Sequence, residues 1–201
     1  MAEFLLRLPA LLLAMVFHEY AHARVANALG DPTPRAHGRL TLNPIAHVDW
    51  IGLAMLWFFR FGWARAVPVN PFNFRNPRSG MALTSLAGPL ANVVLAFLAL
   101  LMLRLGWPAP TSPYFLVVDL FLTYNLALAV FNLIPVPPLD GYRVLGAALP
   151  RGAAGALDVL ERYGWIILVA LVWTGAIGRL MGPLMSGLFG LLDAGARAIA
   201  G

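Results

Sequence analysis

Residues 17–22, Phe-His-Glu-Tyr-Ala-His, lie inside an apolar run that extends from residue 4 to about residue 29. His18 and His22 are four positions apart, so on an α-helix their side chains share one face. Two imidazoles at this spacing can bind one metal ion, and Glu19 can then accept a proton from water at that metal. This H-E-x-x-H pattern is typical of zinc-dependent hydrolysis with the glutamate as general base.

The hydrophobic setting of this motif is stronger evidence for a function than the sequence pattern itself. The chain of 201 residues is 60% hydrophobic and 11% charged, with a mean hydropathy of +0.77, whereas a soluble domain has about 25% charged residues. Ionisable side chains inside a membrane-length helix are costly and usually serve a function. We therefore expect an integral membrane protein and exclude a soluble zinc hydrolase. Because the chain has no Cys, thiolate ligands and disulfides are excluded.

The hydropathy pattern predicts an all-α polytopic membrane protein, a bundle of about five to six transmembrane helices around a three-helix catalytic core. The clear spans are residues 4–29, 80–105, 114–134 and 163–180, while residues 181–199 either cross or lie on the surface. We expect one membrane-embedded domain over residues 1–201, with a core at about 4–146 and C-terminal helices at about 158–199.

A short strand-like or re-entrant segment is expected near residues 35–63. Residues 38–42 alternate like a strand, and residues 51–63 are apolar but number only thirteen and include Arg60. That length is too short for a crossing, so it favours a re-entrant or interfacial segment. His37 and His47 lie in this region, and each is either a substrate-contacting or metal-binding residue or an interfacial loop histidine.

A catalytic zinc site normally has three protein ligands and an open position, so a third ligand must join the two histidines. Asp140 is the best candidate, because it follows a span directly and comes after Pro135-Val136-Pro137-Pro138. These prolines exclude helix and predict extended backbone, which is tolerated at membrane depth only when buried or beside a wet cavity. Asp119 is the alternative ligand, but its flanks give no sign of irregular backbone.

The number of crossings decides whether Asp140 can reach the histidines. If residues 51–63 do not cross, Asp140 returns to the membrane side where the first helix ends. The same side then carries ten arginines and the opposite side two, Arg7 and Arg104. The ten are Arg24, Arg35, Arg39, Arg60, Arg65, Arg75, Arg78, Arg143, Arg151 and Arg162. The positive-inside rule makes the richer side cytoplasmic, so we expect a multi-pass protein of the inner (cytoplasmic) membrane with its site toward the cytoplasm.

Three motifs occur in order along the chain: HEYAH at 18–22, GPLAN at 88–92 and FNLIPVPPLDG at 131–141. Together they resemble the site-2 protease family of intramembrane zinc metalloproteases, over about residues 14–146. The stretches RLTLNPIAHVDWIG (39–52) and GWARAVPVNPFNFRNP (62–77) are similar to its compact bacterial branch, which is expected to lack PDZ and CBS domains.

The resemblance implies one zinc ion per chain held by His18, His22 and Asp140, with Glu19 as the base. It also implies that Asn92 and Asn132 hold substrate backbone or stabilise the oxyanion; the alternative for both is an interhelical hydrogen bond. The implied partners are a transmembrane helix of a membrane-protein substrate and the lipid bilayer. Nucleic acid is not expected, and self-association into a homo-oligomer is left open.

Two further hypotheses remain at this stage. A membrane zinc-binding or zinc-transport protein could use the same three ligands, although it would not need Glu19 and would need a continuous polar pathway. In the protease, a strand-like edge at residues 38–42 could hold an unwound substrate by β-addition.

Overall fold

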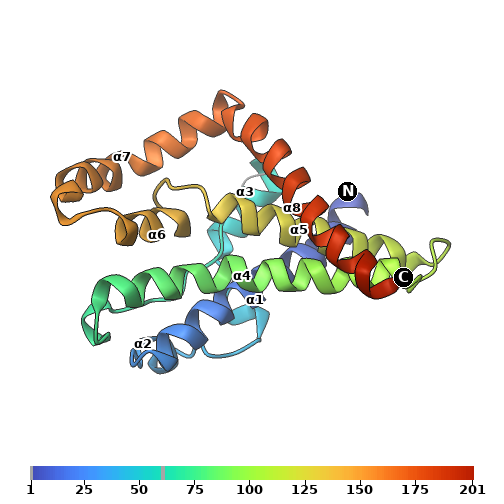
Figure 1. Ribbon diagram of the computed structural model, residues 1–201, viewed down its shortest axis with the longest axis horizontal. Helices are drawn as coiled ribbons and strands as arrows, with labels where there is room; N and C mark the ends of the chain where they lie inside the picture. The colour runs from blue at the N-terminus through green and yellow to red at the C-terminus, as the bar shows by residue number, and fades with distance from the viewer. Residues whose placement is uncertain (1, 60–61) are drawn as a thin grey trace.

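The computed structural model describes residues 2–59 and 62–201, without the side chains of residues 2–6, 56, 59, 151 and 154, and its regular structure is helical (Figure 1). The long helices are α1 (Ala2–Ala28), α4 (Pro77–Arg104), α5 (Pro113–Asn132), α7 (Ala154–Trp173) and α8 (Ala176–Ala200). The short ones are α2 (Thr33–Ala36), α3 (Trp50–Phe59) and α6 (Asp140–Ala148), with 3-10 turns η1 (Pro44–Ala46), η2 (Pro71–Asn73) and η3 (Arg151–Ala153).

The helix ends follow local sequence signals. The Asn76 side chain accepts hydrogen bonds from the first-turn N–H groups of α4, and Pro77 follows it as the first helical residue. Ser112 and Pro113 do the same for α5. A polar N-cap followed by proline is a favoured helix start. After α1, Gly30 adopts a positive φ of 104°, which an L side chain rarely adopts.

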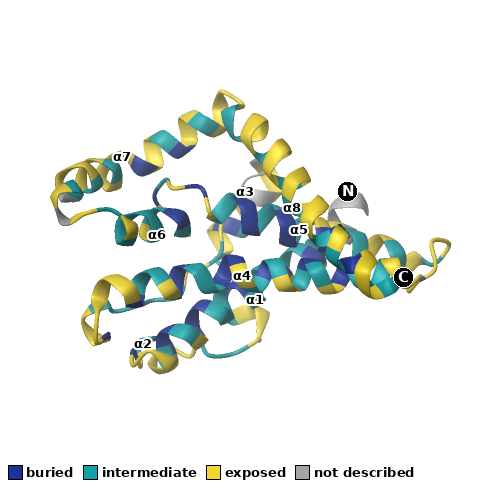
Figure 2. Ribbon diagram, in the orientation of Figure 1, coloured by how far each residue is buried: buried dark blue, intermediate teal, exposed yellow. Residues whose placement is uncertain are grey.

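Helix α4 is the centre of the molecule, because α1, α5, α6 and α8 all pack on it. Burial is concentrated where these helices meet (Figure 2). The largest apolar core joins α4, α5 and α8; its buried members are Ala96, Ala99, Leu100, Leu122, Leu126 and Ala196. The small side chains on α4 let the neighbouring helices approach closely, as is usual where apolar lipid surrounds a bundle.

The two ends of the bundle differ in what they carry. The end of α1, helix α2, the start of α4, helix α6 and the start of α7 lie toward one end (Figure 1). The end of α4, the start of α5 and the end of α8 lie toward the other. Arg24, Arg35 and Arg78 therefore lie toward the first end, and Arg104 and Arg197 toward the second.

The all-helical membrane class is confirmed, but the predicted crossing number is not. By length and composition, α4 and α5 can each cross a membrane, and the broken pair α7–α8 would make a third span. Helix α1 has 27 residues and is long enough to cross, but it is not among the helices of the described part that meet both the length and the composition of a span. The predicted span at 163–180 is also wrong in its limits, because the chain breaks at Gly175 and bends by 80° between α7 and α8.

Two local predictions are wrong. Residues 38–42 form no strand: Gly38 has a positive φ of 66° and the carbonyl of Thr41 accepts a hydrogen bond from the His47 ring. The antiparallel bridge found in the described residues joins Val48 to Ala64 instead. Residues 135–138 are not extended, because Val136 N–H bonds back to Ile134 and Leu139 N–H bonds back to Val136 in tight turns. Proline excludes the helix there but permits such turns.

Candidate metal centre

The two histidines of α1 are oriented by α4. Nδ1 of His18 lies 2.6 Å from Oδ1 of Asn92, and Nδ1 of His22 lies 2.7 Å from the carbonyl oxygen of Thr84. A carbonyl can only accept, so Nδ1 of His22 carries the hydrogen. The Asn92 amide nitrogen donates to the carbonyl of Ala14, so its oxygen faces His18 and that Nδ1 carries a hydrogen too. Both Nε2 atoms are therefore left with a lone pair.

Asp140 completes the group from the first turn of α6. Its Oδ2 atom lies 3.2 Å from Nε2 of His18 and 3.2 Å from Nε2 of His22, and the two Nε2 atoms are 3.0 Å apart. Both imidazoles are buried, at 6% and 8% exposed. Oδ2 of Asp140 is buried and has no hydrogen-bond donor in the described part of the chain. Three acceptor atoms thus face one another with no hydrogen between them.

This arrangement fits a zinc ion. Three facing lone pairs repel one another unless a cation lies between them. Zinc takes imidazole nitrogen and carboxylate oxygen at about 2.0–2.2 Å in a tetrahedral arrangement, which places its ligands about 3.4 Å apart. The observed separations of 3.0–3.2 Å are close to that value. The hydrogen bonds from each Nδ1 to an oxygen are also the usual second-shell support of a zinc-bound histidine.

Two glycines make room for the group. A Cβ atom at Gly88 of α4 would overlap the imidazole rings of His22 and His18, so the ring pair occupies the space that any other residue would fill. A Cβ atom at Gly141 would overlap the carbonyl group of Leu133 at the end of α5. Glycine at 141 therefore allows α6, with Asp140 in its first turn, to start close against the end of α5.

Glu19 is held by a loop that is far away in the sequence. Its Oε2 atom accepts a hydrogen bond of 3.0 Å from the backbone N–H of Val67. Arg65, two residues earlier, donates its N–H to the carbonyl of His47 at 2.9 Å. The guanidinium of Arg39 binds the carbonyls of Ala46 and Arg65 and is buried, at 4% exposed. The Arg39 guanidinium thus fixes the backbone segment whose Val67 N–H binds Glu19.

The same loop is tied to the end of α1. Oδ2 of Asp31 accepts the N–H of Asn70 at 2.8 Å, and Oδ1 accepts from the Asn73 amide at 2.6 Å and from Thr33. Asp31 is completely buried. Burial raises the pKa of its carboxyl, but the hydrogen bonds from Thr33, Asn73 and Asn70 outweigh burial and hold the pKa below its usual value. The carboxylate is therefore ionised and clamps residues 70–73 to α1.

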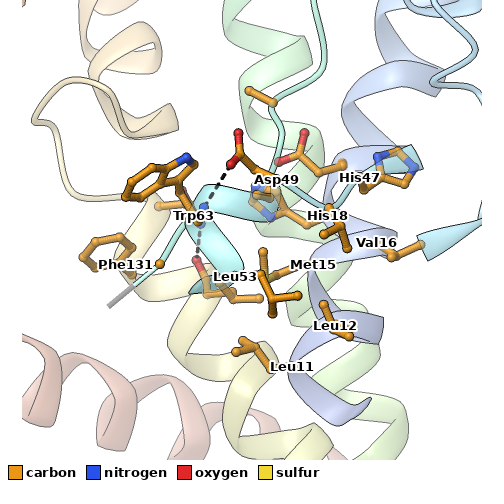
Figure 3. A pocket seen from close by; sticks show the side chains of 18 of the residues that line it. Leu11, Leu12, Met15, Val16, His18, His47, Asp49, Leu53, Trp63 and Phe131 are labelled. Carbon is orange, nitrogen blue, oxygen red and sulfur yellow. Dashed lines mark hydrogen bonds between the residues drawn. The ribbon is translucent and has the colours of Figure 1, made fainter. Parts of the chain in front are cut away.

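A cavity of about 520 Å³ opens beside the metal group (Figure 3). Such a volume is typical of ligand pockets, which are about 300–1,000 Å³. Most of its lining is apolar, from α1, α3, α5 and α7, and includes Leu11, Leu12, Met15, Leu53, Phe131 and Leu168. The polar side chains on it include His18 and Glu19. The predicted base and one predicted ligand therefore face a mainly apolar chamber.

The two asparagines occupy different positions. Asn92 is fully buried, and its two amide hydrogens go to Ala14 and to Oδ1 of Asn125. It has no free donor for an oxyanion, and its contacts match the alternative reading of an interhelical hydrogen bond. Asn132 lines the cavity and donates one hydrogen to Leu128 of its own helix. Its other amide hydrogen has no partner in the part of the chain that the structure describes.

The remaining candidates lie apart from the metal group. Asp119, the alternative ligand, is not among the His, Asp and Glu side chains that converge in the described residues. His37 is exposed and bonds to Thr33 in its own loop, as an interfacial loop histidine would. His47 is buried and lines the cavity, but it is not part of the ligand group either.

Sequence reasoning missed the groups that act through the backbone. The Val67 N–H and the Thr84 carbonyl have no side-chain identity that a motif could record. Asn125 could have been noticed, because it is a polar residue inside an apolar span. Gly88 was present in the GPLAN motif, but only the packing of α4 on α1 shows that its missing side chain makes room for the imidazoles.

The described part of this chain is helical and sets the imidazoles of an H-E-x-x-H helix against an aspartate. The chain belongs to the site-2 protease family of zinc metalloproteases. It is 37% identical over 186 residues, 88% of this chain and 84% of the relative, to YwhC of Bacillus subtilis (strain 168), a proposed zinc metalloprotease. It is 30% identical over 181 residues, 88% of this chain and 70% of the relative, to Rip2 of Mycolicibacterium smegmatis, named in the same way. Rip2 of Mycobacterium tuberculosis (strain H37Rv) is 31% identical over 166 residues, 80% of this chain and 63% of the relative. No family model and no solved structure matches the chain. The resemblance inferred from the motifs is thereby confirmed.

Proposed function

We propose that this protein is an intramembrane zinc metalloprotease that hydrolyses peptide bonds within transmembrane segments of other membrane proteins. One observation carries the proposal: His18, His22 and Asp140 converge within 3.0–3.2 Å, with Glu19 on the same helix, at an apolar cavity inside a helix bundle. The relatives, which are named as proposed zinc metalloproteases, support the same activity.

In this proposal His18, His22 and Asp140 hold one zinc ion. When bound, zinc supplies a Lewis acid that polarises the scissile carbonyl and makes water more acidic. Glu19 accepts the proton of the attacking water and later gives it to the leaving nitrogen. The hydrogen bond from Val67 N–H fixes one carboxylate oxygen of Glu19, which leaves the other oxygen for the proton.

The asparagines take separate roles. Asn92 orients the imidazole of His18, because its amide is fixed from both sides by α1 and α5. Asn132 is the better candidate for holding substrate backbone or stabilising the oxyanion, since it lines the cavity and retains an unused amide hydrogen. A pre-organised donor in an apolar site stabilises developing charge more than it would in water.

The ends of the bundle support one membrane arrangement. We take α1, α4 and α5 as the crossing core, with α7 and α8 as a broken fourth span, and α3 as a re-entrant or interfacial helix because it has only ten residues. The end of the bundle that carries Arg24, Arg35 and Arg78 then faces the cytoplasm of the inner membrane. The substrate is a transmembrane helix, which must unwind locally before Glu19 can act on it.

Zinc transport remains the competing function, and nothing in the site favours it. A transporter has no use for a carboxylate next to its first ligand that is oriented by a backbone N–H. The cavity lining is mostly apolar, whereas a pathway for a divalent cation needs polar groups along its length.

The test compares the wild type with Glu19→Gln in detergent and in vesicles. Both proteins are expected to bind about one zinc per chain, and only the wild type is expected to cleave members of a panel of single-span helices, within the hydrophobic segment. Gln keeps an oxygen for the Val67 N–H but cannot accept the proton. Stoichiometric zinc with Glu19-independent cleavage, or zinc flux without cleavage, would contradict the proposal.

A further inference from the structure

The His47 ring is buried in the wall of the cavity with one nitrogen unpaired. It is 2% exposed, and its Nε2 atom lies 2.8 Å from the carbonyl oxygen of Thr41. Because that carbonyl can only accept, Nε2 carries the hydrogen and Nδ1 of the neutral ring keeps a lone pair. No group in the described part of the chain donates a hydrogen bond to Nδ1.

A buried acceptor without a donor destabilises the structure that contains it, so such groups are rare and usually have a function. His47 lines the same cavity as His18 and Glu19. Figure 3 shows His47 and His18 in the upper part of this cavity, with the apolar side chains of Leu11 and Leu12 below them. No described protein group satisfies Nδ1, so an occupant of the cavity that reaches this part of the wall would find an unused acceptor there.

The position of this ring is fixed relative to Glu19. The carbonyl of His47 accepts the N–H of Arg65, and two residues further along the same segment Val67 N–H binds Glu19. Arg39 fastens the chain on both sides of this pairing, at Ala46 and at Arg65. The acceptor on His47 and the carboxylate of Glu19 are therefore held by two short backbone segments that are paired with each other.

The proposed substrate brings the matching donor. A transmembrane helix that unwinds for hydrolysis exposes peptide N–H groups, and in an apolar chamber each of them needs an acceptor. Of the nearby carboxylates, Glu19 uses one oxygen for Val67 N–H and keeps the other for the proton of water, and Asp49 uses one oxygen for the N–H groups of Ile51 and Gly52 at the start of α3. A metal-binding role for His47 does not compete, because it lies outside the converging ligand group.

We propose that Nδ1 of His47 accepts a hydrogen bond from a backbone N–H of the unwound substrate and so sets which peptide bond lies against Glu19. The inference rests on the proposed protease function and adds a substrate-positioning residue to it. His47 acts on binding and register, whereas Glu19 acts on the chemical step.

Two substitutions separate the two nitrogens of the ring. His47→Gln places an amide N–H near the position of Nε2, so it keeps the bond to Thr41 and removes the acceptor at Nδ1. His47→Asn places an oxygen near the position of Nδ1 and gives up the bond to Thr41. Each is combined with Glu19→Gln, so that binding of a fluorescent single-span helix in detergent is measured without cleavage. We expect His47→Gln to weaken binding by about two- to tenfold, and His47→Asn to bind nearly as well as its parent.

A backbone ester scan of the substrate tests the same bond without altering the protein. Replacing one peptide N–H by an ester oxygen removes a single donor. At one position near the cleavage site, the ester should weaken binding to the protein that retains His47 and cause no further loss in the His47→Gln protein. Equal losses in both proteins at every position would overturn the inference, as would unchanged binding by the His47→Gln protein.

The readouts distinguish this inference from the proposed function. In the background with an intact Glu19, His47→Gln should raise KM, shift the cleavage position, and leave kcat and zinc content nearly unchanged. If the wild type cleaves the helix and His47→Gln leaves its KM and its cut site unchanged, only the role of His47 is overturned. If the wild type cleaves none of the panel, the protease function fails and the role of His47 fails with it.

Discussion

At the scale of single residues, Gly88 contributes by having no side chain. The imidazoles of His18 and His22 lie where its Cβ would be, and the neighbouring groups of α4 receive their Nδ1 hydrogens. A helix ordinarily loses stability at an interior glycine, by about 1 kcal/mol relative to alanine. At this position only glycine leaves room for the two imidazoles, because a side chain on α4 would overlap the rings that α1 brings against it.

Replacement of Gly88 by alanine should therefore abolish zinc binding even though alanine is the better helix former. We expect bound zinc, measured by atomic absorption on purified protein, to fall from about one per chain to well below it, with cleavage lost in parallel. Gly182→Ala in α8 is the matched control, because a Cβ there meets nothing within 4 Å. A Gly88→Ala protein with full zinc content would show that the ring pair is placed differently.

At the scale of elements, the site depends on two fastenings outside the metal group. Asp31 ties the loop that holds Glu19 to the end of α1. Arg78, in the first turn of α4, donates to the carbonyls of Gly146 and Leu149 at the end of α6, the helix that carries Asp140. A cation at the carboxyl end of a helix is favourable for its dipole as well as for its unpaired carbonyls.

The Asp31 clamp should make stability depend on pH at the acidic end. The folded pKa of Asp31 lies below its usual value, so its contribution is present at neutral pH and is lost as pH falls below about 4. Asp31→Asn should lower the free energy of unfolding by about 1–3 kcal/mol at pH 7. Below pH 4 the difference in stability between this variant and the wild type should become smaller. Thermal unfolding of both proteins between pH 3 and 7 measures this, with exposed Asp158→Asn as the control. A gap that does not change with pH would contradict the role of the carboxylate.

The hydrogen bonds from Arg78 to the end of α6 should affect the affinity for zinc, because α6 carries Asp140. Arg78→Ala is expected to weaken zinc binding by about tenfold or more, the usual effect of losing indirect support for a ligand, while Arg78→Lys keeps part of the affinity. Competition with a chelator measures the change. Arg75→Ala, an exposed arginine in the preceding loop, is the control and should leave the affinity unchanged; equal losses for Arg75 and Arg78 would indicate a general charge effect.

The elements also show how far the sequence could predict the site. Spacing alone placed His18 and His22 on one helix face with Glu19 beside them, and the apolar runs located α1, α4 and α5 within a few residues. Asp140 is predicted from its place directly after a span, but the extended backbone expected around it is wrong, since Asp140 begins α6 and the prolines before it form turns. The strand expected at 38–42 failed because alternation over five residues is a weak signal beside the positive φ of Gly38. The loop at residues 64–73 could not be placed, because its contacts are backbone groups far away in the sequence.

At the scale of the whole molecule, α8 is anchored at the end opposite to α6. Asp193 of α8 is 7% exposed and binds Arg104 at the end of α4 and Arg197 one turn further along α8. Together with the apolar core of α4, α5 and α8, this ion cluster fixes the last helix although the chain breaks at Gly175. The cluster shares no residue with the metal site.

Asp193→Asn should therefore loosen α8 without affecting the metal. We expect a lower Tm in detergent and an unchanged zinc content, because the two arginines lose their shared carboxylate. Arg197→Gln should lower the Tm less, since Arg104 still pairs with Asp193. Arg179→Gln, at an exposed position, should leave the Tm unchanged. Loss of zinc at a temperature where α8 is still folded would contradict this separation of the two ends.

The metal site joins parts of the chain that are far apart in the sequence, and this has a consequence for how the protein responds to metal shortage. His18 and His22 are held by α4 through their Nδ1 atoms, whereas Asp140 comes from the first turn of α6. In a chain without cysteine, an ion bound in the proposed site would join α1 to α6 and close a long loop, much as a disulfide would. Chelation should thus release α6 first and leave α1 and α4 packed, so starvation for zinc would yield a dormant protein that reloads rather than an unfolded one.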